Sequence, residues 1–315
     1  MASAKVLRRR ALLAAFILIP TASWAMTKIG TTVPRPRAIP PTVSASPTPS
    51  PPTDSTQLSS PDASFEPDAC LAFPPTSGVA KATVFLDAGH GGVDPGTAGR
   101  TSSGRRVQEK SATLAVVKAA TEQLRAAGFR VVVSRWVDTT VGVPQAGDIA
   151  TGVFTPEGAR HDVLARVACA NASGAKALVS VHMNAFSSPA EGGALTIWDP
   201  DRTFSSANQR LATLLQQNVI SSLHGAGWPV PDRSILKDTQ NHGGALTPQG
   251  AAYGHEALLG PYARGWVSHP TYMPGAIIEP LFLTRPTEAD IATTAAGQAV
   301  LAKAILNAVQ AFLQT

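Results

Sequence analysis

The stretch VFLDAGHGGVDPGTAG, residues 84–99, decides the fold of this chain. Its first part, Val84–Leu86, is a short apolar run of the kind that forms a buried strand, and the glycines after it end that strand. In open α/β sheets, ligands collect beyond the carboxyl ends of the strands, which is where His90 stands. The flanking glycines allow a tight bend and the close approach of a bulky ligand. His90 is therefore predicted to be a metal ligand or a catalytic group.

Strand and helix patterns alternate along the rest of the chain. Apolar runs and helical periodicity predict strands at 129–134, 177–181, 194–198 and 276–283, and helices at 109–127, 157–172, 205–223 and 288–313. Strands separated by helices favour a single α/β domain with a mainly parallel, mixed, twisted sheet and helices on both faces. The strand at 194–198 is expected at an edge of the sheet. The glycine-rich region that follows, residues 225–268, is expected to be irregular and to line or cover the site.

The first 25 residues are predicted to be a secretory signal peptide. Basic residues precede an apolar run at 11–19 that is too short to span a membrane, and Ser23–Ala25 supplies small residues before a cleavage point. An uncleaved membrane anchor is the alternative. This segment contains four of the basic residues and no acidic one, so its removal lowers the formal charge from +5 to +1. The charge therefore gives no argument for a nucleic-acid partner.

Residues 26–68 are rich in Pro, Ser and Thr and contain almost no large apolar residue. Such a segment cannot bury enough surface to offset its ordering entropy, so it is predicted to be a disordered, semi-rigid linker. The remainder, residues 69–315, is long enough for one domain with its own core. The mature protein is expected in the periplasm or cell-wall space, or secreted, as a monomer with no membrane span.

The two cysteines, Cys70 and Cys169, are predicted to form a disulfide that ties the start of the domain to its body. An even pair of cysteines in an exported protein is most simply a bridge. Two free buried thiols are the alternative. The pair is too sparse for a cysteine-based zinc site.

Four side chains are candidates for one shared site. His90 and His182 each follow a predicted strand, and Glu279 lies inside an apolar strand. Glu109 opens the first predicted helix. Since the carboxyl ends of parallel strands meet at one edge, the four can meet there. Two imidazoles and one carboxylate form a frequent catalytic zinc set, and a further carboxylate can move the proton of a water. Each residue also has an ordinary structural interpretation, and spacing alone does not decide between the two.

Four separated motifs carry more information than spacing. They are DAGHGGVDPG at 87–96, QEK at 108–110, SVHMNA at 180–185 and MPGAIIEPLFL at 273–283. In this order, over nearly the whole domain, they resemble the zinc-dependent N-acetylmuramoyl-L-alanine amidases of bacterial cell walls. The resemblance is specific because it rests on several motifs and on their spacing.

The resemblance implies that His90, Glu109 and His182 bind one Zn²⁺ and that Glu279 is the catalytic carboxylate. The implied reaction is hydrolysis of the amide between the lactyl group of N-acetylmuramic acid and L-alanine. Its substrate is peptidoglycan or muropeptide fragments, for wall remodelling, cell separation or fragment recycling. Two further polar residues, Asp87 and Asn184, are candidates for orienting the metal ligands.

The chain departs from the family pattern after the glutamate, where Leu281 and Arg285 replace the usual glycine and asparagine. Pro280 lacks the N–H that a sheet requires, which suits an edge strand or a bulge. A zinc carboxypeptidase or endopeptidase acting on stem peptides is an alternative, as is a non-catalytic wall-binding relative. Glu279 argues against the binder, because binding alone needs no such carboxylate. Whether an activator protein is required is left open.

Overall fold

β3 (Thr83–Ala88) lies inside an eight-stranded sheet in the computed structural model, which describes residues 51–241 and 247–314. It pairs in parallel with β6 (Arg130–Arg135) on one side and with β9 (Ala177–Val181) on the other. Almost all residues of these strands are buried, and most of them are apolar. Such continuous apolar runs are typical of parallel strands that are covered on both faces.

The sheet is mixed outside this parallel centre. β12 (Gly275–Glu279) runs parallel to β9, whereas β10 (Ala194–Trp198) is antiparallel to β12, and β11 (Asp232–Lys237) is parallel to β10. On the other side, β2 (Ala69–Phe73) is antiparallel to β6 and β1 (Thr56–Gln57) is antiparallel to β2. The full order is β1-β2-β6-β3-β9-β12-β10-β11. The predicted α/β fold with a mainly parallel, mixed sheet is confirmed.

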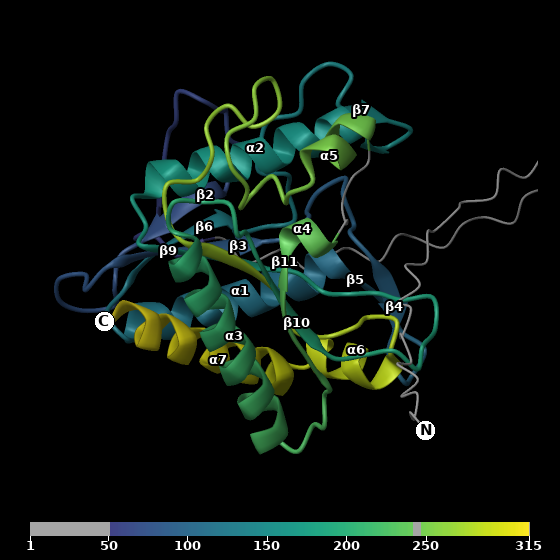
Figure 1. Ribbon diagram of the computed structural model, residues 1–315. Coiled ribbons are helices and arrows are strands. Elements are labelled where there is room, and N and C mark those ends of the chain that lie inside the picture. The colour runs from purple at the N-terminus through teal and green to yellow at the C-terminus, as the bar shows by residue number, and fades with distance from the viewer. Residues whose placement is uncertain (1–50, 242–246, 315) are drawn as a thin grey trace, which may run out of the picture. The chain divides into compact units, whose positions relative to one another are not determined.

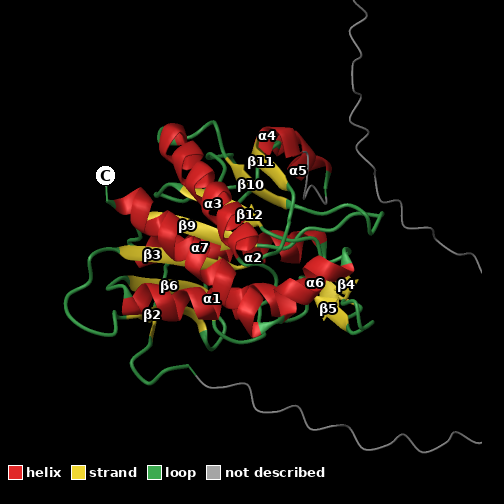
Figure 2. Ribbon diagram, turned by 90° about the horizontal axis from the view of Figure 1, so that it is seen from below, coloured by secondary structure: helices red, strands yellow, loops and turns green. Residues whose placement is uncertain are grey.

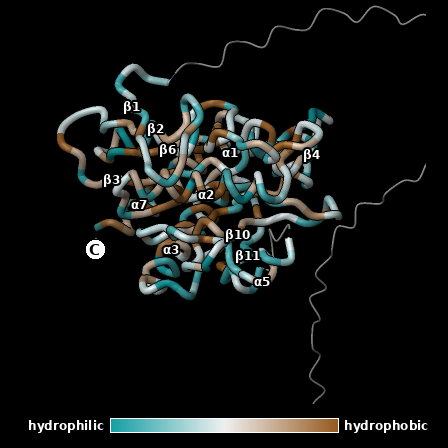
Figure 3. Tube along the Cα trace, turned by 90° about the horizontal axis from the view of Figure 1, so that it is seen from above, coloured by the Kyte–Doolittle hydropathy of each residue, from teal (hydrophilic) through white to brown (hydrophobic). Residues whose placement is uncertain are grey.

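Helices cover both faces of the sheet (Figure 1). α1 (Glu109–Ala126), α3 (Ser205–Gly225) and α7 (Ala295–Leu313) share one apolar core with the sheet, and Figure 2 shows them on the same side. α2 (Pro156–Ser173) packs on the opposite face in a second cluster. Figure 3 shows the hydrophobic stretches of the chain concentrated in the interior of the domain. Both predicted layers of helices are therefore present.

α7 is the most apolar of these helices. It is long enough to cross a membrane, with a mean hydropathy of 1.3, but half of that window is buried inside the domain. The helix packs against α1 and α3. Its hydrophobicity is therefore explained by its place in the core.

Several short elements complete the fold. They are β4 (Ala98–Arg100), β5 (Arg106–Gln108), β7 (Ile149–Ala150), β8 (Val153–Phe154), α4 (Asp238–Asn241), α5 (Pro248–Tyr253) and α6 (Pro286–Thr293). β4 and β5 form a hairpin that leads directly into α1.

Two sequence predictions about the sheet are wrong. The strand at 194–198 is not at an edge, because β11 pairs with it on its outer side, within a region predicted to be irregular. The strand predicted at 276–283 ends at Glu279, and Pro280 follows it. Since Pro280 lies beyond the last paired residue, the central strand loses no N–H from its ladder. Neither an edge position nor a bulge is needed.

The helix predicted at 288–313 is two helices, α6 and α7. Thr294 separates them with extended backbone angles, and its hydroxyl accepts a hydrogen bond from the N–H of Gly297. A threonine in this position is a favourable N-cap and starts a new helix. The apolar periodicity continues across the break, so periodicity alone did not reveal it.

Residues 51–68 correct the predicted linker at 26–68. β1 pairs with β2, and the side-chain amide of Gln57 donates to two backbone oxygens further along the segment. Phe65 packs against two apolar clusters of the domain. A few local anchors thus hold a segment whose overall composition is that of a linker. The signal peptide and the rest of the predicted linker, residues 1–50, lie outside the described residues.

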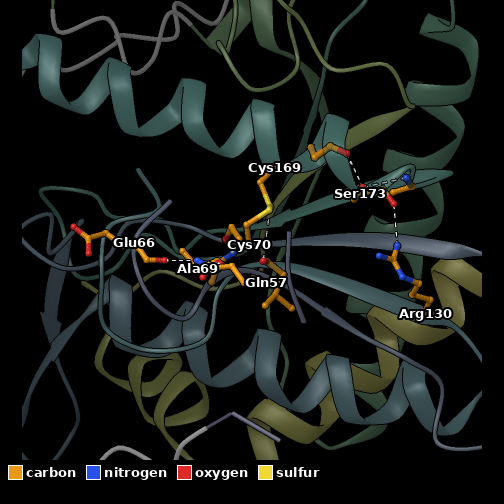
Figure 4. Close-up of a disulfide and its surroundings, with 12 residues drawn as sticks. Gln57, Glu66, Ala69, Cys70, Arg130, Cys169 and Ser173 are labelled. Atoms are coloured by element: carbon orange, nitrogen blue, oxygen red, sulfur yellow. Dashed lines mark hydrogen bonds between the residues drawn. A yellow bond between two sulfur atoms is a disulfide. The ribbon is translucent and has the colours of Figure 1, made fainter. Parts of the chain in front are cut away.

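Cys70 on β2 and Cys169 on α2 form a disulfide, which confirms the predicted pairing (Figure 4). Their sulfurs are 2.06 Å apart and their Cα atoms 5.6 Å apart. The bond joins the sheet to the helix layer that covers it, across a sequence separation of 99 residues.

Replacing both cysteines with alanine should lower the free energy of unfolding by about 3–5 kcal/mol, because a bridge across so long a loop strongly restricts the unfolded chain. Denaturant titration of the variant against the oxidised wild type measures the change. Reduced wild type is the matched control, since it loses the bond but keeps both side chains. A loss below about 1 kcal/mol in both proteins contradicts a stabilising role for the bridge.

Candidate metal and catalytic site

Adjacent strands bring the candidate residues to one edge of the sheet. His90 follows β3 and His182 follows β9 directly, while Glu279 is the last residue of β12. These three strands are neighbours and run in parallel, so their carboxyl ends coincide. Glu109 reaches the same place as the first residue of α1, positioned by the preceding hairpin.

The two imidazoles face the carboxylate of Glu109. His90 Nε2 is 3.1 Å from Glu109 Oε2, and His182 Nδ1 is 3.1 Å from Glu109 Oε1. One ligand atom from each of the three residues lies within 4.8 Å of the others. The glutamate is 3% exposed, and its oxygens accept hydrogen bonds from the backbone N–H groups of Thr97 (2.8 Å) and Met183 (2.9 Å). The three residues thus form a compact donor set around a fixed carboxylate.

Two glycines leave room for this arrangement. A Cβ atom at Gly89 would lie 2.4 Å from the His182 ring. At Gly96, which has a φ of +62°, a Cβ would lie 2.6 Å from the His90 ring and 2.7 Å from Glu109 Oε2. Any side chain at either position would therefore push the donor atoms apart. The glycine-rich character of the first motif has a direct structural reason.

Asp94 is a site residue that the sequence analysis missed. Its Oδ2 lies 2.7 Å from His90 Nδ1, which leaves Nε2 facing Glu109. Such a partner fixes the orientation of the ring. The sequence feature that could have identified Asp94 is its position four residues after His90 in the same loop.

Electrostatics couple the three donors. Burial disfavours a charged His90, but hydrogen bonds with Asp94 and Glu109 outweigh it and raise the pKa of His90 to about 9. Burial likewise disfavours ionised Glu109, but hydrogen bonds from His182 and His90 prevail and hold its pKa well below the usual range. The carboxylates of Asp94 and Glu109 therefore favour a positive charge on His90, which contacts both. A metal ion bound here has to displace the proton on His90.

Glu279 has a different environment from Glu109. Burial, followed by the negative charges of Glu109 and Glu256, raises the pKa of Glu279 to about 8. Asn184 Nδ2 donates to Glu279 Oε2 over 2.5 Å. A carboxyl group in such surroundings exchanges its proton near neutral pH. Asn184, expected to orient a metal ligand, contacts this carboxyl instead.

Asp87 also lies elsewhere than expected. It is fully buried, and its oxygens accept hydrogen bonds from Arg166 Nη1 and from the Ser180 hydroxyl, both over 2.6 Å. Burial opposes its ionisation, but the charge of Arg166 prevails and lowers the pKa of Asp87 to about 2. Arg166 also donates to the backbone oxygens of Ala88 and His90, each over 2.8 Å. Asp87 thus holds Arg166, which in turn supports the loop backbone. Among the described residues, it does not contact the side chain of a proposed metal ligand.

The segment 225–268, expected to line or cover the site, contributes Glu256. Burial raises the pKa of this carboxyl, and Asn241 Nδ2 donates to its Oε1 over 3.2 Å. Its charge acts on both Glu279 and His182. Glu256 stands in no recognisable sequence pattern, so only the folded chain reveals it.

Comparison with known proteins connects this geometry to one family. The family model described as N-acetylmuramoyl-L-alanine amidase matches residues 84–311. The N-acetylmuramoyl-L-alanine amidase AmiC of Neisseria meningitidis is 27% identical over 246 residues, which is 74% of this chain and 53% of that protein. The chain spans about half the length of the curated relatives it matches.

Solved structures of amidases share the fold. The N-acetylmuramoyl-L-alanine amidase from Clostridium difficile 630 is 26% identical, with a TM-score of 0.51, covering 76% of this chain and 99% of that one. The CwlD amidase from Clostridioides difficile, in complex with the GerS lipoprotein, has a TM-score of 0.56 at 22% identity, covering 74% and 99%. The family model covers well over half of the residues of this chain. The chain therefore belongs to the N-acetylmuramoyl-L-alanine amidase family.

Proposed function

We propose that this protein is a zinc-dependent amidase that hydrolyses the bond between N-acetylmuramic acid and L-alanine in peptidoglycan or muropeptide fragments. The observation that carries the proposal is the donor set of His90, Glu109 and His182, within 4.8 Å, at the strand edge where Glu279 also ends β12. Membership of the amidase family supports the choice of bond.

The donor chemistry fits one zinc ion. Two imidazole nitrogens and one carboxylate oxygen are a frequent catalytic set for zinc, with a further position left for water or substrate. In a tetrahedral site with bonds of about 2.0–2.2 Å, neighbouring ligand atoms lie about 3.4 Å apart. His90 Nε2 lies 3.1 Å from Oε2 of Glu109 and His182 Nδ1 lies 3.1 Å from Oε1, so each imidazole is near this spacing from one of the two carboxylate oxygens. When bound, zinc polarises a carbonyl and lowers the pKa of water to about 7.

Glu279 has the proton-transfer role in this proposal. It accepts a proton from the attacking water and delivers it to the amine nitrogen of L-alanine as the amide bond breaks. A pKa of about 8, raised mainly by burial, suits a group that must both take and give a proton. Asn184 holds one oxygen of the carboxyl, so the group keeps a fixed orientation during both transfers.

Analysis of digestion products tests the proposal. Purified protein is incubated with muropeptides, with and without a chelator, and the products are identified by mass spectrometry. An amidase yields glycan with a free lactyl carboxyl group plus an intact stem peptide, and the chelator prevents this. A shortened stem peptide instead identifies a carboxypeptidase or endopeptidase. Retention on wall material without any product identifies a wall-binding relative.

We further propose that the chain is exported and acts as a monomer, with residues 1–25 as a cleaved signal peptide and residues 26–50 as a linker. The disulfide between Cys70 and Cys169 supports an oxidising compartment. The proposed peptidoglycan substrate supports a location in the periplasm, the cell-wall space or the medium. Sequencing the amino terminus of the mature protein locates the cleavage point.

A further inference from the structure

A second group of metal-ligand side chains lies away from His90, Glu109 and His182. Asp199 and Asp238 directly follow β10 and β11, which are neighbouring parallel strands, and His255 follows α5. One ligand atom from each of the three lies within 4.8 Å of the others. His255 Nδ1 is 2.8 Å from Asp199 Oδ2 and 3.5 Å from Asp238 Oδ2. The same nitrogen thus faces both carboxylates.

Among the residues that the structure describes, two atoms at the centre of this group lack a hydrogen-bond partner. Asp199 is fully buried, yet its Oδ2 accepts no hydrogen bond, and His255 Nδ1 is likewise unpaired. The 2.8 Å between them does not have the angle of a hydrogen bond. An unpaired buried polar atom is costly, and a bound cation is one way to satisfy it.

The other contacts of the two carboxylates are a side-chain hydrogen bond between Asp238 and Asp199 and hydrogen bonds from backbone N–H groups. Asp199 Oδ1 accepts the N–H of Asp201, and Asp238 accepts the N–H groups of Thr239 and Glu256. Within residues 51–241 and 247–314, neither aspartate has an ion pair with a lysine or arginine.

Neighbouring charged side chains do not neutralise the carboxylates of Asp199 and Asp238. Arg202 acts on Asp199 only at longer range, since its guanidinium donates to backbone oxygens, among them that of Leu259. Two carboxylates held this close favour a positive charge between them.

We propose that Asp199, Asp238 and His255 bind a second divalent cation, separate from the proposed catalytic zinc. An imidazole nitrogen with two carboxylate oxygens suits a first-row transition ion, for which zinc and manganese are the natural probes. Exposed Asp201, whose Oδ2 is 3.6 Å from His255 Nε2, stands at the rim of the site. Water completes the coordination.

The ion has a structural consequence for the proposed active site. It ties the segment after α5 to the ends of β10 and β11, and the next residue in that segment is Glu256, whose N–H already binds Asp238. Glu256 in turn contributes to the raised pKa of Glu279. This consequence rests on the proposed function, whereas binding of the ion does not.

Metal counting on the purified full chain tests the site. The protein is demetallated, saturated with Zn²⁺, freed of excess metal and analysed for its zinc content. We expect two ions per wild-type chain and one each in the variants His255→Ala and His90→Ala. The double variant should bind none. His161→Ala is the matched control, because its Nδ1 is also 2.8 Å from an aspartate, Asp148, but outside this group; it should keep two ions.

The zinc count of the His90→Ala variant tests for a second site without depending on how well His255→Ala folds. One zinc remaining in the His90→Ala variant supports a second site, and its loss in the double variant places that site at His255. Manganese that binds in a His255-dependent manner gives the same support. A wild type that binds one ion of either metal, with none left in His90→Ala, overturns the proposal, as does a double variant that still binds an ion. Two bound ions in a protein without amidase activity would reject the proposed function and leave this site intact.

Discussion

Replacement of Glu279 by glutamine is expected to reduce turnover of muropeptides by about 10²–10⁴-fold, the contribution that a positioned proton-transfer group typically makes. The amide has nearly the same size as the carboxyl, but it cannot accept and release a proton. Glutamine still offers an oxygen to Asn184, which donates to Glu279 over 2.5 Å, so the local structure should persist. The catalytic zinc should remain bound, because its proposed ligands are untouched. Turnover by product analysis and zinc content by elemental analysis check the two halves of this prediction.

Glu288→Gln is a suitable control for that variant. Glu288 is also buried, and burial likewise raises the pKa of its carboxyl, but its oxygens accept backbone N–H groups from Gly193 and Phe282. Its replacement should affect stability rather than turnover per folded molecule. Unchanged hydrolysis in the Glu279→Gln variant would remove Glu279 from the mechanism. Loss of zinc from that variant would give the residue a binding role instead.

The parallel centre of the sheet was predictable from local sequence. β3 and β9 are short, mainly apolar runs, each followed within two residues by a histidine, and residues 177–181 form a strand with the predicted limits. Continuous apolar runs identify strands buried on both faces. Because parallel strands end at one edge, the convergence of His90 and His182 followed from the same pattern.

The features that the sequence did not reveal, β11 and the second group of metal-ligand side chains, depend on pairing between distant segments. β11 has few buried residues, so no apolar run marks it, and it forms only because β10 offers an edge. Asp199, Asp238 and His255 meet for the same reason, since each is an ordinary polar residue until that pairing brings them together. The register of a strand without a buried face is weakly specified, so composition and periodicity did not reveal the pairing of β11 with β10.

Replacement of His90 by asparagine is expected to remove the catalytic zinc and, with it, hydrolysis. His90 has a φ of +61°, a left-handed conformation that asparagine tolerates better than most residues, so the variant removes the imidazole with little backbone strain. Loss of an outer hydrogen-bond partner of a metal ligand typically weakens metal binding about 10–100-fold, and loss of the ligand itself should exceed that range. Competition with a chromophoric chelator measures the affinity, and product analysis measures the activity.

The Asp94→Asn variant is the matched comparison for His90→Asn, because it should weaken zinc binding without removing a ligand. Asp94 contacts His90 Nδ1 over 2.7 Å, so its change should weaken zinc binding within the range of about 10–100-fold while leaving all three proposed ligands present. Affinity and activity should then fall in the order wild type, Asp94→Asn, His90→Asn. If His90→Asn retains zinc with wild-type affinity at the site on which activity depends, the ion is not held by His90. In that case the convergence of His90, Glu109 and His182 would be a network of polar contacts, in which the carboxylate of Glu109 serves only to hold the two imidazoles in place.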